Sequence, residues 1–449
     1  MINLDGLQAE LDGELLVPES PGYEDVRRPA NPAYRDVRPR AMIQCASVTD
    51  VALGIRYARE AGIPIVPRGG GHCFAGRSST DGVVLDLAGL DGIAVTDDGR
   101  ATIGAGARLA QVYTTLHLHG RTVPAGCGAT VGIAGLTLGG GIGLLGRRYG
   151  FTCDRLAGAQ VVLADGRVVD CDADREPELF WALRGAGGGQ FGVVTSLVFD
   201  TVPEPVTTRF ELRWALPPDQ AAQTVAAWQS WAPGAPDEIT ANLTVIAEPG
   251  EPPEAVLFGA SLQEEAVSRA LLEEFRDAAG VNPEVDVRGG LPFHRLKTSF
   301  DDIDLRGEPG EEPGASVLRS RSELFARPMR PATTDAMLST FFGGEPGGGR
   351  QLTFTAMGGA YNRAPETATA FAHRNELFLL QHTAEAPSAW IDRSWEIAHA
   401  DGSGRVYPNF PDPRLDDWAD AYHSGNHSRL AAAKKTYDPN RLFDFPQCV

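Results

Sequence analysis

The sequence of 449 residues lacks several common signatures, and each absence excludes a class of protein. No apolar run approaches the roughly 18 residues that a membrane-spanning helix needs, so no membrane association is expected. Six cysteines are scattered without a C-x-x-C pair, which argues against a zinc ribbon, a redox dithiol and a disulfide scaffold. The first residues have neither a basic segment nor an apolar stretch, so no secretory signal is recognised and the expected location is cytoplasmic.

Basic residues are the minority, with 40 Lys and Arg against 59 Asp and Glu and a net charge of −19. An acidic surface repels phosphate backbones, so nucleic acid is not an expected partner, and Lys434 and Lys435 are interpreted as a solvated pair. Neither G-x-x-x-x-G-K-[ST] nor G-x-S-x-G occurs, which excludes a P-loop and the nucleophile elbow of α/β-hydrolases.

No metal site is predicted from the histidines. His423 and His427 are four residues apart, but no glutamate lies between them and Gly425 interrupts the helix, so surface positions are expected. His117 and His119 close a predicted helix, where they are expected to interact with its C-terminal end.

The apolar pattern predicts alternating strands and helices, and the length predicts two or three domains. Helices are expected at 48–60, 108–118, 218–231, 263–279, 387–400 and 413–435. Strands are expected at 63–67, 83–87, 101–106, 159–164, 167–171, 209–214, 241–246, 255–261, 351–357 and 376–383. The stretch 305–315, rich in Gly, Pro and Glu, is expected to be a loop. The mixture indicates an α+β or α/β protein.

What the sequence has in abundance is glycine, with 52 residues and dense clusters at 69–71, 132–143 and 185–192. Glycine lets backbone N–H groups approach a ligand closely, and successive N–H groups form a concave anion site. Three clusters in the first 200 residues therefore predict a cofactor that carries a pyrophosphate. The Rossmann fingerprint needs a strand before and a helix after its glycines, and the first cluster leads instead to another strand.

The clusters, together with the C-terminal segment, resemble a known family. The matching motifs are Arg68-Gly69-Gly70-Gly71-His72, Val131 to Gly143, Phe191 to Thr195, Tyr407-x-Asn409 and Tyr437-Asp438-Pro439-x-x-x-Phe443. In this order they resemble the berberine-bridge-enzyme-like branch of the vanillyl-alcohol-oxidase superfamily. The resemblance implies an α+β fold with a PCMH-type FAD-binding domain made from both chain ends, 1–203 and 401–449. It also implies a substrate domain at 204–400, an antiparallel sheet backed by helices.

The same resemblance implies how FAD is held. His72 matches the histidine bonded to the 8α-methyl carbon of the flavin, a bond that raises the redox potential. Other residues matching cofactor-binding positions are Arg68, Gly69, Gly70, Gly71, Cys73, Thr130, Val131, Gly132, Gly135, Gly139, Gly140, Val194 and Asn409. Many members carry a second bond from a cysteine two residues before the Thr-Val-Gly motif. Here Cys127 lies three residues before Thr130, so single and double attachment are both open.

For catalysis, the resemblance implies that Tyr407 is the base that takes a substrate proton and that Gln381 orients the substrate. Thr355 stands where some carbohydrate oxidases carry an acid, which weakens a sugar-oxidase interpretation. Val131 resembles the small residue of oxidase members, so the favoured function is an FAD-dependent oxidase that passes hydride from a small organic molecule to flavin and then to O₂, giving H₂O₂. The alternatives are a dehydrogenase with another acceptor and a flavin-binding protein without turnover.

Overall fold

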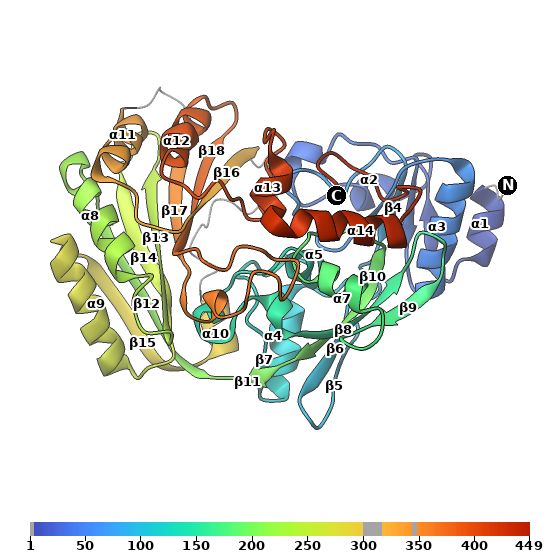
Figure 1. Ribbon diagram of the computed structural model, residues 1–449, viewed down its shortest axis with the longest axis horizontal. Helices are drawn as coiled ribbons and strands as arrows, with labels where there is room; N and C mark the ends of the chain where they lie inside the picture. Colours follow the sequence, from blue (N-terminus) through green and yellow to red (C-terminus); the bar gives the residue numbers. More distant parts are fainter. Residues whose placement is uncertain (1–3, 300–316, 344–347) are drawn as a thin grey trace.

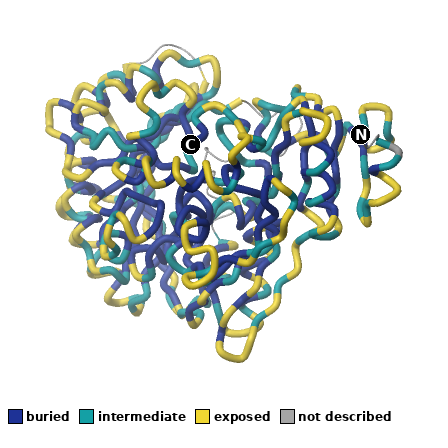
Figure 2. Tube along the Cα trace, turned by 45° about the vertical axis from the view of Figure 1, so that its right-hand side comes forward, coloured by how far each residue is buried: buried dark blue, intermediate teal, exposed yellow. Residues whose placement is uncertain are grey.

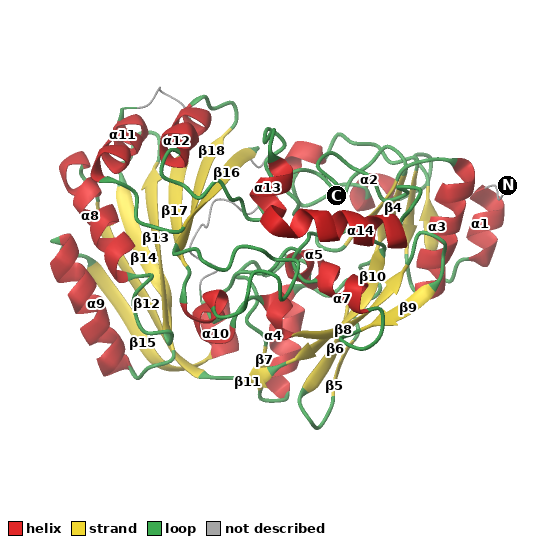
Figure 3. Ribbon diagram, viewed as in Figure 1, coloured by secondary structure: helices red, strands yellow, loops and turns green. Residues whose placement is uncertain are grey.

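The computed structural model describes residues 4–299, 317–343 and 348–449, so the loop predicted at 305–315 lies outside the described residues. Figure 1 shows two bodies side by side, one built from the two chain ends and one from the middle of the chain. Each body combines helices with a sheet (Figure 3), which confirms the predicted α+β class. Among the described residues, no helix has both the length and the hydropathy needed to cross a bilayer.

The body formed by the chain ends contains two larger sheets. The first has the order β1-β2-β4-β3, with β2, β4 and β3 parallel: β1 (Glu14–Leu16), β2 (Ala41–Gln44), β3 (Ile65–Arg68), β4 (Val83–Asp86). The second is antiparallel with the order β5-β6-β10-β8-β9: β5 (Ile93–Val95), β6 (Arg100–Gly104), β8 (Leu156–Val162), β9 (Val168–Cys171), β10 (Val193–Asp200). The helices of this half are α1 (Leu4–Glu10), α2 (Tyr23–Val26), α3 (Val48–Ala61), α4 (Leu109–Leu118), α5 (Ile133–Leu138), α6 (Gly146–Tyr149) and α7 (Pro177–Leu183).

Helix α3 shows how local sequence sets these elements. Ser47 accepts a hydrogen bond from the backbone N–H of Asp50, whose side chain caps Ser47 in return, so the helix begins with a capping box. It ends at Gly62, whose φ of 65° is a left-handed conformation that glycine adopts without strain. The predicted helix at 48–60 is therefore confirmed.

The middle of the chain forms a seven-stranded antiparallel sheet of order β15-β12-β14-β13-β17-β18-β16. Its strands are β12 (Val206–Ala215), β13 (Ile239–Ala247), β14 (Glu254–Ser261), β15 (Glu284–Pro292), β16 (Leu318–Phe325), β17 (Arg350–Ala356) and β18 (Phe378–Glu385). Helices α8 (Pro218–Trp231), α9 (Glu265–Ala279), α11 (Pro331–Phe342) and α12 (Trp390–His399) cover one face, whereas α10 (Phe293–Thr298) follows β15 toward the other body (Figure 1). The sequence pattern does not predict β15, β16 or α11.

Alternation along the strands separates the two faces of this sheet. On β17, Leu352 and Phe354 pack in the core beneath the helices, while Gln351 and Thr353 point to the opposite face. The dark blue interior in Figure 2 follows the strands of both bodies. Because the outer face carries the helices, the polar inner face is left to line a site.

The C-terminal segment returns to the first body, and here three predictions are wrong. The helix predicted at 413–435 is divided into α13 (Trp418–His423) and α14 (His427–Tyr437), because Ser424 has a φ of 48° and a 3₁₀ turn follows. Lys434 is buried rather than solvated: its ammonium lies 2.8 Å from the Asp438 carboxylate and donates to the carbonyl of Gln190 at 2.6 Å. This lysine ties the end of the chain to the third glycine cluster. His423 is also buried, not at the surface.

A buried carboxyl beside the C-terminal segment gives the fold a pH dependence. Burial raises the pKa of Glu376 to about 7, although the Arg405 guanidinium, 3.6 Å away, acts in the opposite direction. The folded state therefore holds this proton more tightly than the unfolded chain. The contribution to stability is present below the unfolded pKa of about 4.5 and is lost as the pH rises through 7.

In the Glu376→Gln variant this side chain cannot ionise. We therefore expect the free energy of unfolding of the variant to fall less between pH 5 and pH 8 than that of the unmodified chain, by up to about 3 kcal/mol. Denaturant unfolding of both proteins at the two pH values measures this difference. The exposed Glu396→Gln variant serves as the control, since it should leave the pH dependence unchanged. Equal pH dependence of the Glu376→Gln variant and the unmodified chain would contradict the prediction.

Candidate functional site

A cavity of about 370 Å³ lies where the glycine clusters, the polar face of the central sheet and the C-terminal segment meet. Its lining includes most of the residues predicted to bind FAD or to act on substrate: Gly69, Gly70, Gly71, His72, Cys73, Cys127, Val131, Gly132, Gly135, Val194, Gln381, Tyr407 and Asn409. The tertiary structure thus brings together residues that are up to 340 positions apart in the sequence. The predicted residues Arg68, Thr130, Gly139 and Gly140 are not among the lining residues.

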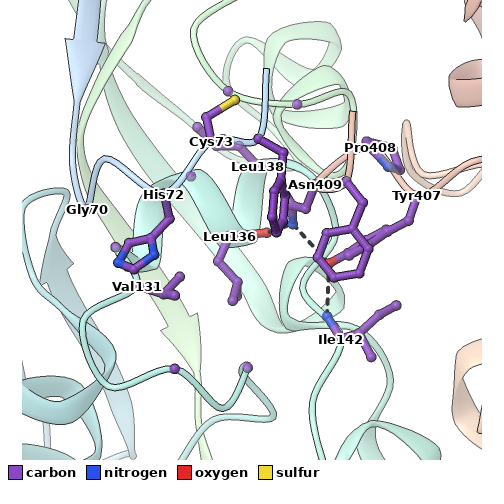
Figure 4. A pocket seen from close by; sticks show the side chains of 18 of the residues that line it. Gly70, His72, Cys73, Val131, Leu136, Leu138, Ile142, Tyr407, Pro408 and Asn409 are labelled. Atoms are coloured by element: carbon purple, nitrogen blue, oxygen red, sulfur yellow. Dashed lines mark hydrogen bonds between the residues drawn. The ribbon is translucent and has the colours of Figure 1, made fainter. Parts of the chain in front are cut away.

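The first cluster follows β3 and forms a loop that ends in His72. A Cβ on Gly70 would lie 2.4 Å from the backbone nitrogen of Gly132, so only glycine allows the first and second clusters to touch. The hydroxyl of Thr130 lies 2.9 Å from Nε2 of His72 and fixes the ring orientation. Figure 4 shows His72 beside Val131 at one end of the site. Thr130 therefore acts as the partner of the histidine.

Two glycines of the second cluster are required by protein packing. A Cβ on Gly139 would lie 2.1 Å from Oδ1 of Asn409, and one on Gly140 would lie 2.8 Å from the ring of Phe371. In contrast, a Cβ on Gly135 would meet no protein atom within 4 Å, although this residue lines the cavity. Gly139 and Gly140 thus support the C-terminal segment, while Gly135 leaves room for a ligand.

Two arginines lie near the first glycine cluster and have different contacts. The buried Arg68 guanidinium donates to the carbonyls of Arg27 at 2.8 Å and Ser78 at 3.0 Å, so its side chain holds the surrounding loops. Arg77, which the sequence analysis missed, lines the cavity and stacks over the Phe445 ring at 4.8 Å. An arginine six residues after a glycine cluster was the available signal, and its charge suits an anionic ligand.

Three N–H donors converge on the phenol oxygen of Tyr407. The backbone nitrogens of Gly141 and Ile142 lie at 3.0 and 3.1 Å, and the amide nitrogen of Asn409 lies at 2.9 Å (Figure 4). A neutral phenol oxygen has two lone pairs, whereas a phenolate can accept three hydrogen bonds, so this set favours the ionised form. Burial acts more strongly in the other direction and raises the pKa of Tyr407 to about 12.

Gln381 lies on β18, opposite Thr353 of β17 in the strand register. Its amide nitrogen donates to the hydroxyl of Ser320 at 2.8 Å, which orients the amide group. Further hydroxyl and amide groups of the central sheet line the same cavity, and the sequence analysis missed most of them: Thr240, Asn242, Gln351, Thr353 and Thr355. Only strand alternation could have indicated them, because each is an ordinary polar residue.

Cys127 lines the cavity from the short loop between Gly126 and Gly128. The carbonyl of Gly126 accepts hydrogen bonds from the buried Lys297 ammonium at 2.6 Å and the Tyr113 hydroxyl at 2.9 Å. These two donors, from distant parts of the chain, hold the peptide that precedes Cys127. The thiol therefore faces the site from a fixed backbone.

The residues present fit FAD. The lining includes Val194 and the glycines 187–189 of the first body, Gln381 of the central sheet and Tyr407 of the C-terminal segment. Glycine backbone and one arginine, Arg77, belong to this lining, and such groups bind a pyrophosphate. The space beside Gly135 is open to a ligand, and a side chain at this position would fill it.

Comparisons with known proteins agree with this geometry. Residues 39–172 match the family model described as FAD binding domain, and residues 406–449 match the one described as berberine and berberine like. The FAD-linked oxidoreductase YgaK of Bacillus subtilis, itself uncharacterised, is 30% identical over 98% of both chains. The chain therefore belongs to the berberine-bridge-enzyme-like FAD-linked oxidoreductases.

Two further relatives place it within that family. The chitooligosaccharide oxidase of Gibberella zeae is 29% identical over 92% of this chain and 87% of its own. The solved structure of Physcomitrella patens BBE-like 1 superposes with a TM-score of 0.90 at 28% identity, covering 100% of this chain and 99% of that one. The predicted family, its FAD cofactor and an oxidoreductase function on small organic molecules are thereby confirmed.

Proposed function

We propose that this protein is an oxidase in which FAD is bonded to His72, Tyr407 is the catalytic base, and O₂ takes the electrons to form H₂O₂. The observation that carries the proposal is the set of three N–H donors on the Tyr407 oxygen, at the wall of a glycine-lined cavity. A phenol used only for packing has no need of three donors. Such a set stabilises the negative charge that a proton-accepting tyrosine must hold.

The residues of the site would each have a separate role in the reaction. FAD, when bound, supplies the hydride acceptor. Tyr407 would receive the hydroxyl proton of the substrate on its Oη, while Gly141, Ile142 and Asn409 stabilise the charge at that atom. Gln381, oriented by Ser320, would hold the substrate by a hydrogen bond. The closely packed clusters around His72 would exclude bulk water.

The polar face of the central sheet supports a neutral substrate with several hydrogen-bonding groups. Hydroxyl and amide groups are offered there by Thr240, Asn242, Thr353 and Gln381. The charged Arg77 side chain lines the glycine-rich part of the cavity instead. Such groups match an alcohol or hemiacetal better than a carboxylate or an amine. The relative from Gibberella zeae, an oxidase of chitooligosaccharides by name, supports the same class.

We also propose the domain division 1–203, 204–400 and 401–449. It is supported by the hydrophobic cores. One core combines residues from Leu7 to Phe199 with Leu430 and Val449, and a second core runs from Phe210 to Ala398. Where the two bodies meet, the first core also takes in residues of the middle segment: Val256, Phe258, Ala260, Phe293, Leu296 and Ala370.

The test separates the oxidase from its two alternatives. Purified protein is screened anaerobically with neutral alcohols and aldoses, and bleaching of the flavin absorption identifies a substrate. With that substrate in air, an oxidase forms one H₂O₂ per turnover without added dye. Bleaching without H₂O₂ favours a dehydrogenase, and no bleaching by any compound favours a carrier without turnover.

Val131 provides a prediction on the oxygen reaction. We expect Val131→Leu to slow the reoxidation of the substrate-reduced protein by O₂ at least tenfold, or about 1.4 kcal/mol of barrier, because the larger side chain fills space beside His72. Stopped-flow mixing with O₂ measures this rate. The rate of reduction by substrate is the internal control and should change little. Unchanged reoxidation would remove Val131 as the determinant.

A further inference from the structure

Two histidines and a glutamate converge at the seam between the two bodies, away from the FAD cavity. His117 is in the last turn of α4, Glu204 follows the short strand β11 (Val202–Pro203), and His294 is in α10. Nδ1 of His117 lies 2.6 Å from Oε2 of Glu204, and Nδ1 of His294 lies 3.2 Å from Oε1. All the ligand-type atoms lie within 4.8 Å of one another. His117 lies in the last turn of its helix, as expected, and also pairs with a carboxylate.

The two imidazoles are closer than aromatic packing explains. Their ring centroids are 3.4 Å apart at an interplanar angle of 27°, whereas aromatic pairs prefer about 4.5–7 Å. This stacking directs both Nδ1 atoms to the same carboxylate. The carboxylate is itself positioned, because Oε1 accepts the backbone N–H of His294 at 2.8 Å and the Glu204 nitrogen donates to Gly120 at 2.9 Å. Ligands held by such secondary hydrogen bonds are typical of metal sites.

We propose that His117, Glu204 and His294 bind one divalent transition-metal ion, with zinc as the best match. Two imidazole nitrogens and one carboxylate oxygen form a ligand set that Zn²⁺ accepts, and water completes the tetrahedron. Metal–ligand distances of about 2.0 Å require ligand atoms about 3.3 Å apart, which His294 and Glu204 already have. The His117 ring, which now contacts the other carboxylate oxygen and stacks on His294, must turn out of the stack to direct its Nδ1 to the same ion. Its side chain is 34% exposed and has the room to do so.

The ion would link the two bodies at their connection. His117 belongs to the first body, His294 to the helix that follows β15, and Glu204 to the segment that joins them. Next to it, β11 pairs with β7 (Arg121–Thr122) in a two-stranded ribbon (Figure 1). The proposed role is a structural clamp, because three protein ligands from three elements would have to separate before the bodies could move apart.

The experiment uses the full-length flavoprotein, with any histidine tag removed, after chelator treatment and dialysis. Titration with ZnCl₂, followed by elemental analysis of the desalted protein, should give one zinc per chain and a raised melting temperature. Co²⁺ in the same site should give the visible absorption of tetrahedral cobalt, at longer wavelengths than the flavin. Both readouts are independent of turnover.

Variants locate the ion. His294→Gln and Glu204→Gln should each weaken zinc binding by more than the roughly 10–100-fold that loss of a secondary partner costs. His117→Gln, at an exposed helix end, is the variant least expected to disturb folding. His119→Gln is the matched control: an exposed histidine on the same helix end, outside the cluster, whose loss should change nothing.

An unchanged flavin content shows that each variant is folded. Zinc that binds equally well to the three ligand variants would overturn the proposal, because the ion would then lie elsewhere. Absence of stoichiometric zinc in the unmodified chain would also overturn it and would leave a purely hydrogen-bonded bridge.

Discussion

Replacing Tyr407 with phenylalanine is expected to lower kcat by about 10²–10⁴-fold while FAD stays bound, as is typical for the loss of a positioned base. The phenyl ring keeps its packing, and only the oxygen is lost. The two backbone N–H groups and the Asn409 amide then lack their acceptor, which also destabilises the fold by about 1–3 kcal/mol. Steady-state kinetics with the substrate found in the anaerobic screen measures the loss.

The pH profile distinguishes a base from a structural hydroxyl. A base acts in its deprotonated form, and burial raises the pKa of Tyr407 to about 12. The deprotonated fraction therefore increases about tenfold per pH unit below that value, so kcat/KM of the unmodified protein should rise from pH 6 to 9 without a plateau. In the phenylalanine variant this rise should disappear.

Tyr361 offers a matched control for this experiment. It is also buried, and its hydroxyl bonds the backbone of Gly143, with the N–H at 3.0 Å and the carbonyl at 2.9 Å. It is not part of the cavity lining described by the structure. We expect Tyr361→Phe to lower stability but to keep the rising pH profile. Full activity of the Tyr407 variant, or equal effects of both variants, would contradict the assignment.

The second large effect concerns the covalent bond to FAD. We expect the double variant His72→Ala, Cys127→Ala to give a colourless pellet on acid precipitation and the mass of the plain chain. Cys127→Ala alone should keep a coloured pellet, because His72 is still present. With the His72 bond lost, the flavin potential falls, and we expect kcat to drop by about 10–100-fold, or about 1.4–2.8 kcal/mol of barrier.

The single variant His72→Ala decides whether the cysteine is bonded as well. Colour retained in its pellet establishes a bond to Cys127, whose backbone is held by Lys297 and Tyr113. Loss of all colour leaves His72 as the sole attachment. Thr130→Val tests the orientation of the ring, since it removes the contact to Nε2 and should lower the fraction of attached FAD. A coloured pellet from the double variant would refute both assignments.

The glycine clusters show how far sequence reasoning reaches. Their density predicts a backbone-lined cofactor site, and the cavity has that lining. The sequence pattern does not separate Gly135, which leaves space for a ligand, from Gly139, which makes room for Asn409. The residue type is the same, and only the identity of the neighbour, 270 positions further along the chain, distinguishes the two roles.

The wrong predictions for the C-terminal segment also concern contacts and breaks that the apolar pattern does not show. Lys434 in a polar helix is predicted to be solvated, yet it is buried because Asp438 and two carbonyls from other segments surround its ammonium. The break at Ser424 had a local signal, because Gly425 in the 3₁₀ turn interrupts the helix, but the apolar pattern continues through it and predicts one helix.

The sequence by itself determined the elements whose signals are local: capped helices such as α3, alternating strands such as β17, and the clusters that lead to His72. Hydrogen bonds within a few residues and the periodicity of apolar side chains encode these features. Only the tertiary structure decided which distant groups meet, as with Tyr407 and the N–H of Gly141, or His117 and His294. Such meetings depend on the packing of whole sheets and helices, which no short stretch of sequence specifies.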